Sequence, residues 1–358
     1  MAFDPVQEDC HRLILGAMRR GGAALTDARF VQKCMGLFEH DTDRLIACDA
    51  DRSFHLTAKA TEILDYRIPF LNNDTEAERD AKRAEDMLRE ACSLDPGNWD
   101  AKRMLVALTA GSNDEYVSFL QEHCAELEDE LTRRIAAAES DYDREAACDL
   151  MRRPYLRWLA ALSSKLLISG RYRMALDVAE KSLAYSPIDQ AGVHYTAVLA
   201  LAKLECTDEE LMSFRSSHII AFRDLESPFA PIRRSRNLQD PWTLIAQMGI
   251  AYHSFDYGAA ETVLRQLLGS CPNAAECLYF QTEFPDGVYA RVSVEPGSQD
   301  ELILALSEAT PLLQEGLGAP DNAGFAAWIA THDLVRSALD KSVLRAAEAQ
   351  RRVNGGEN

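Results

Sequence analysis

Residues 155–187 read YLRWLAALSSKLLISGRYRMALDVAEKSLAYSP, and this stretch decides the predicted fold. Leu159, Leu162 and Leu166 recur at steps of three and four residues. That spacing places them on one face of an amphipathic helix. The first half of the stretch is therefore predicted to be a helix that buries its leucine face.

The second half of the stretch contains the features that end one helix and begin another. Gly170 permits the left-handed backbone found at helix ends, and Tyr172 can fill the space beside the turn. Ala175 and Ala179 are small enough to let two helices approach closely, and Pro187 stops the second helix. The whole stretch predicts a helical hairpin.

Two further blocks show the same order of residue types. Both place small or apolar residues at helical spacing before a proline, and the later block has a tyrosine at its turn. The earlier block has Ala84, Leu88, Ala91 and Pro96, and the later one has Leu244, Tyr257, Ala260, Leu264 and Pro272. Repetition of one hairpin is typical of repeat proteins, whose units stack on their neighbours.

Several helix starts are predicted from the capping-box spacing. In this motif a Ser or Thr precedes a Glu by three residues. Thr75 with Glu78, Thr207 with Glu210, and Ser298 with Glu301 fit it.

The three blocks resemble the tetratricopeptide repeat (TPR), a helix–turn–helix unit of about 34 residues. The order of segments also resembles, more weakly, the bacterial relatives of the suppression-of-tumorigenicity family. That second resemblance rests on Arg153-Pro154-Tyr155 before the middle block, a Pro-rich insertion and a long tail. The resemblance implies an all-α fold, a TPR-like solenoid of helical hairpins. Its repeats are degenerate, because Ser163 and Met248 stand where the unit usually has Gly or Ala.

Four regions are expected along the chain. Residues 1–74 form an N-terminal helical region, and 75–280 carry the repeats with inserted helices. Residues 281–352 hold an extended segment and capping helices, and 353–358 form a disordered tail. Alternating Val288, Ala290, Val292 and Val294 after a turn predict a short extended or hairpin insertion near 279–296.

In TPR relatives the leading helices line a concave groove that binds peptides. The positions that hold a ligand carboxylate in such relatives carry Ala160 and Ser164 in the middle block, and Ile245 and Gly249 in the last. This predicts that no carboxylate-binding set of the usual kind is present.

The predicted groove instead exposes basic and aromatic residues: Arg103, Arg157, His194, Trp242 and Tyr252. An exposed Arg157 would make Arg157→Glu weaken partner binding with little loss of stability. An alternative is open for Trp242 and Tyr252, which could simply pack between repeats, since large aromatic residues usually serve burial.

Composition excludes some classes of partner. The 358 residues carry 38 Lys+Arg and 57 Asp+Glu, a net charge of −19. Such acidity argues against nucleic acid and against an anionic membrane surface. Nine scattered cysteines, with no signal peptide at the N-terminus, predict reduced thiols in a cytoplasmic protein.

The sequence shows no recognised catalytic motif, so no catalytic, cofactor-binding or metal-binding residue is predicted. The expected function is non-catalytic protein–protein interaction, with another protein or peptide bound in the concave groove. The alternative is an enzyme or small-ligand-binding protein with its site in the non-repeat region 279–335. That region contains His332-Asp333 and the carboxylates Glu283, Asp286 and Glu295.

Overall fold

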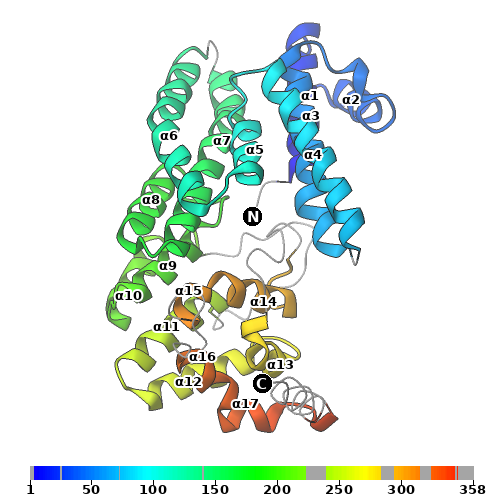
Figure 1. The fold of residues 1–358 in the computed structure, drawn as a ribbon. Helices are drawn as coiled ribbons and strands as arrows, with labels where there is room; N and C mark the ends of the chain where they lie inside the picture. Colours follow the sequence, from blue (N-terminus) through cyan, green and yellow to red (C-terminus); the bar gives the residue numbers. More distant parts are fainter. Residues whose placement is uncertain are drawn as a thin grey trace. The chain divides into compact units, whose positions relative to one another are not determined.

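The structure is a computed structural model, and it describes residues 4–24, 26–71, 73–138, 141–222, 239–283, 294–314, 324–342 and 345, with only the backbone for 141–149. Every regular element in these ranges is a helix (Figure 1). The prediction of an all-α fold is therefore confirmed for the described residues. Residues 284–293 of the extended insertion predicted near 279–296 lie outside them, as does the tail 353–358, and Tyr279 and 281–283 at the start of that range are helical.

The chain divides into two compact units, Met1–Lys165 and Leu166–Asn358. The predicted boundaries at 74 and 280 each fall inside one unit and remain predictions. No helix in the described part of the chain is both long and apolar enough to span a bilayer.

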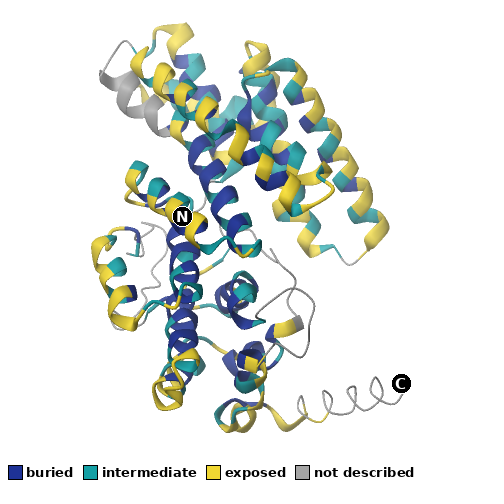
Figure 2. Cartoon of the chain, turned by 60° about the vertical axis from the view of Figure 1, so that its left-hand side comes forward, coloured by how far each residue is buried: buried dark blue, intermediate teal, exposed yellow. Residues whose placement is uncertain are grey.

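Unit one contains six helices and the first part of a seventh. They are α1 (Pro5–Gly21), α2 (Ala28–His40), α3 (Asp49–Thr61), α4 (Asp74–Leu94), α5 (Trp99–Thr109), α6 (Asn113–Ala136) and α7 (Asp141–Ile168). Three short helical segments complete it: η1 (Thr42–Arg44), η2 (Glu62–Arg67) and η3 (Ile68–Phe70). Each helix turns a buried face inward and an exposed face to solvent, as Figure 2 shows.

Unit two contains the remaining helices. They are α8 (Tyr172–Tyr185), α9 (Val193–Lys203), α10 (Asp208–Ser217), α11 (Pro241–His253), α12 (Tyr257–Leu268), α13 (Ala274–Tyr279), η4 (Gln281–Glu283), α14 (Gln299–Glu308), α15 (Thr310–Leu313), α16 (Gly324–Thr331) and α17 (Asp333–Ala338).

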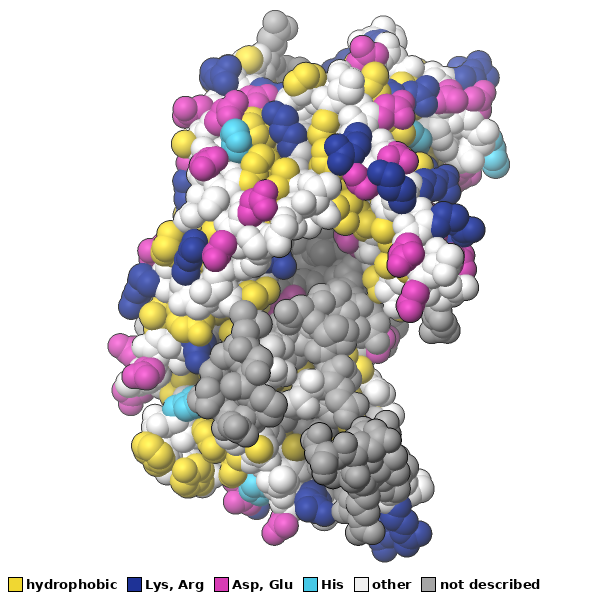
Figure 3. Space-filling model, viewed as in Figure 1, with side chains coloured by type: hydrophobic (Ala, Val, Ile, Leu, Met, Phe, Trp, Pro, Cys, Tyr) yellow, Lys and Arg dark blue, Asp and Glu magenta, His cyan; other side chains and the backbone are white. Residues whose placement is uncertain are grey.

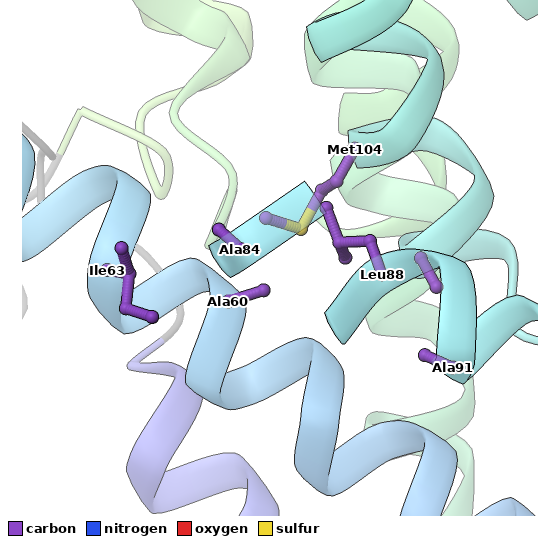
Figure 4. Packing of buried hydrophobic residues seen from close by; sticks show 7 residues of the cluster. Ala60, Ile63, Ala84, Leu88, Ala91 and Met104 are labelled. Atoms are coloured by element: carbon purple, nitrogen blue, oxygen red, sulfur yellow. The ribbon is translucent and has the colours of Figure 1, made fainter. Parts of the chain in front are cut away.

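The hairpin of α3 and α4 forms the best-defined core of unit one. Ala84, Leu88 and Ala91 of α4 are fully buried, as predicted, and they face Ala60 of α3 (Figure 4). Alanines at the crossing let the two backbones come close. Met104 of α5 closes the same cluster, so three consecutive helices share one core.

The predicted turn of the middle block is confirmed residue by residue. Gly170 adopts φ +74°, α8 begins at Tyr172, and Pro187 follows the end of α8. Ala175 and Ala179 are fully buried. The leucines Leu159 and Leu162 of α7 are also buried, as their spacing predicted.

The last predicted block is a hairpin of α11 and α12. Leu244, Ala260 and Leu264 are buried in it as expected, whereas Tyr257 is 48% exposed. The helices of unit two pack in a series, α8 with α9, α9 with α11, and α11 with α12. Each contact joins elements that are near neighbours in the sequence.

Helices α14 and α15 cover one face of this series. Both pack against α11, and α15 also contacts α9. At Gly249 of α11, an added Cβ would lie 2.9 Å from a methyl carbon of Leu312 in α15. Glycine is needed here because the two helices approach too closely for a side chain.

The predicted capping boxes have different outcomes. Thr207 and Glu210 form a complete one at the start of α10. Ser298 caps α14, but the Glu301 side chain accepts from the amide of Gly297 at 2.8 Å instead of closing the box. The prediction at Thr75 is wrong, because Asn73 caps α4 two residues earlier.

We expect Ala175→Trp to unfold unit two, because the indole would have to enter a helix contact with no free space. Overpacking of this kind costs about 1–3 kcal/mol or more. Thermal unfolding measures the effect, and Ala184→Trp, on the exposed side of α8, is the matched control. Equal melting temperatures for the two variants would contradict the packing described here.

Candidate functional site

A cluster of buried charges joins α1, α5 and α7 in unit one. We call it the Glu8 cluster, and it consists of Glu8 and Arg12 of α1, Asp100 and Arg103 of α5, and Arg153 and Arg157 of α7. The Glu8 side chain has no exposed surface. Its carboxylate accepts from Arg12 Nη2 at 2.8 Å and from Arg157 Nη1 at 2.7 Å, and Arg153 Nη1 lies 3.5 Å away.

Arg157 is shared between two carboxylates. Its Nε donates to Asp100 Oδ1 at 2.8 Å, and its Nη2 also contacts the other oxygen of Asp100. Its Nη1 is directed at Glu8. The guanidinium thus uses one edge for α5 and Nη1 for α1, and Nη2 also donates to Glu8 Oε1 at 3.3 Å.

The pKa values of Glu8 and Arg157 show that the cluster favours the charged form of both groups. Burial alone would raise the pKa of Glu8, but Arg157 and Arg12 outweigh it and lower that pKa to about 2. Burial would likewise lower the pKa of Arg157, yet Asp100 and Glu8 raise it. Glu8 and Arg157 are therefore both ionised throughout the physiological pH range.

Two helix caps place these charges. Asp4 caps α1 by accepting from the amides of Val6 and Gln7, at 2.9 and 3.0 Å, which puts Glu8 in the first turn. Asn98 caps α5 by accepting from the amide of Ala101 at 3.0 Å, which puts Asp100 in its first turn.

Asn98 also ties α5 to α3. Its Nδ2 donates to Ser53 Oγ at 2.9 Å and to Thr57 Oγ1 at 3.0 Å, and both hydroxyls are buried. One amide side chain therefore begins a helix and fixes its position on the neighbouring one.

A second polar contact lies next to the Glu8 cluster. His55 Nδ1 of α3 lies 2.6 Å from Asp9 Oδ2 of α1, and the Asp9 side chain is almost fully buried. Together, Glu8 and Asp9 give α1 adjacent charged contacts with α7 and α3.

The predicted groove residues Arg103 and Arg157 meet at Asp100. Arg103 Nη2 lies 3.8 Å from Asp100 Oδ1. Because Arg157 is held between two buried carboxylates, Arg157→Glu would set like charges against each other. The expectation that this substitution leaves stability nearly intact is therefore wrong.

The predicted groove residues of unit two, His194 and Trp242, are buried at 5% and 2% exposure. The expectation that they are exposed is wrong. Asp189 holds His194, with 2.6 Å between Oδ2 and Nδ1, and it also accepts from the His194 amide. Burial raises the pKa of Asp189, but these hydrogen bonds from His194 outweigh it, so that pKa is lowered.

Trp242 is buried through contacts on two sides. Its ring stacks on Tyr195 with 3.9 Å between centroids, and its Nε1 donates to Glu308 of α14 at 2.7 Å. Helix α14 therefore covers the face of α11 that was predicted to line an open groove, and this covering buries Trp242.

Tyr252 belongs to an aromatic patch on the surface of unit two. Its ring lies 5.7 Å from Tyr257 and 5.5 Å from Trp328, and the ring of Phe255 lies 6.5 Å from Tyr257. We call these four residues the aromatic patch. Phe255 is 78% exposed, and Figure 3 shows exposed hydrophobic side chains over the α11–α12 hairpin at the lower left.

Phe255 combines exposure with an unfavourable backbone. Its φ is +62°, in the turn between α11 and α12. In the turn that precedes α8, Gly170 stands two residues before Tyr172, just as Phe255 stands two residues before Tyr257. A bulky side chain in the left-handed region costs roughly 1–2 kcal/mol, so glycine would be less strained than phenylalanine at this position.

The region of the alternative site is only partly described. His332 caps α17 by accepting from the amide of Leu334 at 3.2 Å, and its ring lies 4.9 Å from Trp328. Asp286 lies outside the described residues, as does the side chain of Glu283. Among the residues that the structure describes, no three His, Cys, Asp or Glu side chains are placed to hold a metal ion.

Comparison with known protein families, with curated proteins and with solved structures finds no match.

We expect Arg157→Leu to destabilise unit one by about 3–5 kcal/mol, because it leaves two buried carboxylates without their shared partner. Denaturant unfolding measures the loss. Arg89→Leu is the control, since Arg89 is an exposed partner of Glu85 on α4 and should change stability by less than about 1 kcal/mol. Similar losses for both variants would show that the Glu8 cluster does not stabilise the unit.

The stabilising effect of Glu8 should disappear in acid. Its pKa is lowered to about 2 from 4.5, so the charged form stabilises the fold above pH 4.5, and this effect is lost as the pH falls toward 2. The difference in unfolding free energy between wild type and Glu8→Gln should be constant above about pH 5 and narrow below it. A difference in unfolding free energy that does not change with pH would refute the assignment of this stabilisation to ionised Glu8. Glu39→Gln is the control, because Glu39 is exposed on α2.

Proposed function

We propose that the protein is a non-catalytic, TPR-like helical-hairpin protein that binds another protein. The observation that carries this proposal is Phe255, which is both strained and exposed. Both the left-handed backbone and the exposed apolar side chain of Phe255 destabilise the fold. We infer that such a residue is present because it contacts a molecule outside the chain. Its neighbours Tyr252, Tyr257 and Trp328 supply the rigid aromatic area that protein interfaces favour.

The packing of unit two supports the repeat part of the proposal. Hairpins follow one another from α8 to α12, with alanine at the close contacts and a left-handed residue at the turns. Stacking of this kind buries faces that a single hairpin would leave exposed. It also presents the turns between helices at the surface.

The proposed contact surface differs from the groove expected from sequence. His194 and Trp242 are buried, and Arg157 is engaged by Glu8 and Asp100, so the predicted groove residues are not presented together to a partner. The aromatic patch contains one of them, Tyr252. The net charge of −19 continues to favour a protein partner over nucleic acid or an anionic membrane.

A site-specific photocrosslinking experiment tests the proposal. A photoreactive phenylalanine analogue at position 255 should yield a discrete adduct in a lysate of the source organism, and the same analogue at Met35 should not. Met35 is a matched control because it is also exposed, at 48%, but lies on α2.

The identified partner is then purified and its affinity measured. Phe255→Gly should weaken binding by roughly 30-fold, the effect of losing an interface anchor, while the melting temperature stays equal or rises because glycine relieves the strain. No adduct at position 255, or unchanged affinity of the glycine variant, would overturn the proposal.

A further inference from the structure

The hairpin of α1 and α2 has a hydrophobic cluster of its own. Leu13, Ile14 and Met18 of α1 pack with Cys34 of α2 and with Leu45. The core of α3, α4 and α5 is a separate cluster. The N-terminal hairpin is therefore held together independently of the surface on which it rests.

Polar contacts attach this hairpin to α7. Glu8 pairs with Arg157 and Arg153, and Arg12 Nη2 donates to the carbonyl of Leu150 at 2.9 Å. On α3, the attachment includes the Asp9–His55 pair and the Arg12 guanidinium over the ring of Phe54.

We propose that the arginine surface of α5 and α7 is a binding site for an acidic helical segment of a partner, and that α1 occupies this site within the chain. Glu8 stands in for a carboxylate of the partner. Release of the α1–α2 hairpin exposes Arg153 and Arg157, the two arginines of α7 that contact Glu8. The segment that fits carries a Glu or Asp on the same face as its apolar residues, as α1 does.

The site is organised without α1. Asp100 holds the guanidinium of Arg157 through Nε and Nη2 and leaves Nη1 directed at the position of Glu8. Without Glu8, Arg153 and Arg157 each lose a carboxylate contact, so the surface attracts negative charge. The guanidinium of Arg157 is therefore already oriented to bind a carboxylate before the partner segment arrives.

One buried atom of α1 lacks a hydrogen bond. Asp9 Oδ1, on the carboxylate that also faces His55 of α3, is buried and has no hydrogen-bond partner. Burying such an atom costs free energy, so the packing of α1 in unit one is imperfect and another segment can compete with it. This site lies in unit one, apart from the aromatic patch, and goes beyond the function proposed above.

Hydrogen–deuterium exchange of the full chain tests the release. In Glu8→Gln, amides of residues 5–40 should exchange at least tenfold faster than in wild type, while those of α4 and α5 stay unchanged. Glu39→Gln is the control. Unchanged exchange of residues 5–40, or equal acceleration in α4 and α5, would overturn the proposal.

A labelled peptide of residues 4–22 tests the binding. Full-length Glu8→Lys, in which lysine is repelled by Arg153 and Arg157, should bind this peptide at least tenfold more tightly than the wild-type chain does. The peptide carrying Glu8→Lys should not bind either chain. Equal binding of the two peptides would overturn the proposal, and so would a failure of the wild-type peptide to bind the Glu8→Lys chain. If the Glu8→Lys chain does not fold, the hydrogen–deuterium exchange experiment on Glu8→Gln still tests the proposal.

Discussion

The arrangement of unit one depends on one guanidinium. Arg157 of α7 joins Asp100 of α5 and Glu8 of α1, so three helices from distant parts of the chain meet at a single side chain. Buried ion pairs are poor sources of stability, because removing charges from water costs about as much as their attraction returns. What this one supplies is position. Because Asp100 holds one edge of the guanidinium, Glu8 can pair with Arg157 only where Nη1 is directed, and this restricts the placement of α1.

Within each unit, a later or earlier part of the chain covers the helix faces that a simple repeat array would leave open. In unit one α1 packs on α3 and reaches Arg157 of α7 through Glu8, and in unit two α14 and α15 pack on α11. The two covers differ in chemistry. The contact at α11 is tightly packed, with Gly249 against Leu312, whereas the contact of α1 with α7 is made by charged and polar groups. The polar cover is the one that can be exchanged for another ligand.

Local features of the fold could be predicted from the sequence because they depend on neighbours along the chain. The turn at Gly170, the buried alanines of α4 and α8, and the capping box at Thr207 all follow from spacing within a few residues. The capping residue of α4 was assigned wrongly to Thr75 because Asn73 is also a good cap, and spacing does not rank two candidates. The covering of α11 by α14 joins residues such as Trp242 and Glu308, 66 positions apart, and no local pattern encodes it.

The candidate site shows the same limit: its local features could be predicted, but its contacts between distant residues could not. Arg103 and Arg157 were predicted as exposed groove residues, and their contacts with buried carboxylates were not predicted. A signal for them existed: Glu8 lies two helical turns from buried Leu15, and Asp100 lies one turn from buried Met104. A charged residue that lies on the apolar face of a helix predicts a buried ion pair, but the sequence does not identify the residue that pairs with it. Phe255 was overlooked because its distinguishing feature is a backbone angle.

The sequence separation of Glu8 and Arg157, 149 residues, has a consequence for synthesis on the ribosome. Chains grow at about 5–20 residues per second, so Glu8 waits roughly 10–30 s before its partner has been made. During that interval α1 cannot rest on α7, which does not yet exist. The small core shared with α2 keeps the nascent α1 folded, and its apolar face is thereby shielded from other nascent chains until the arginine arrives.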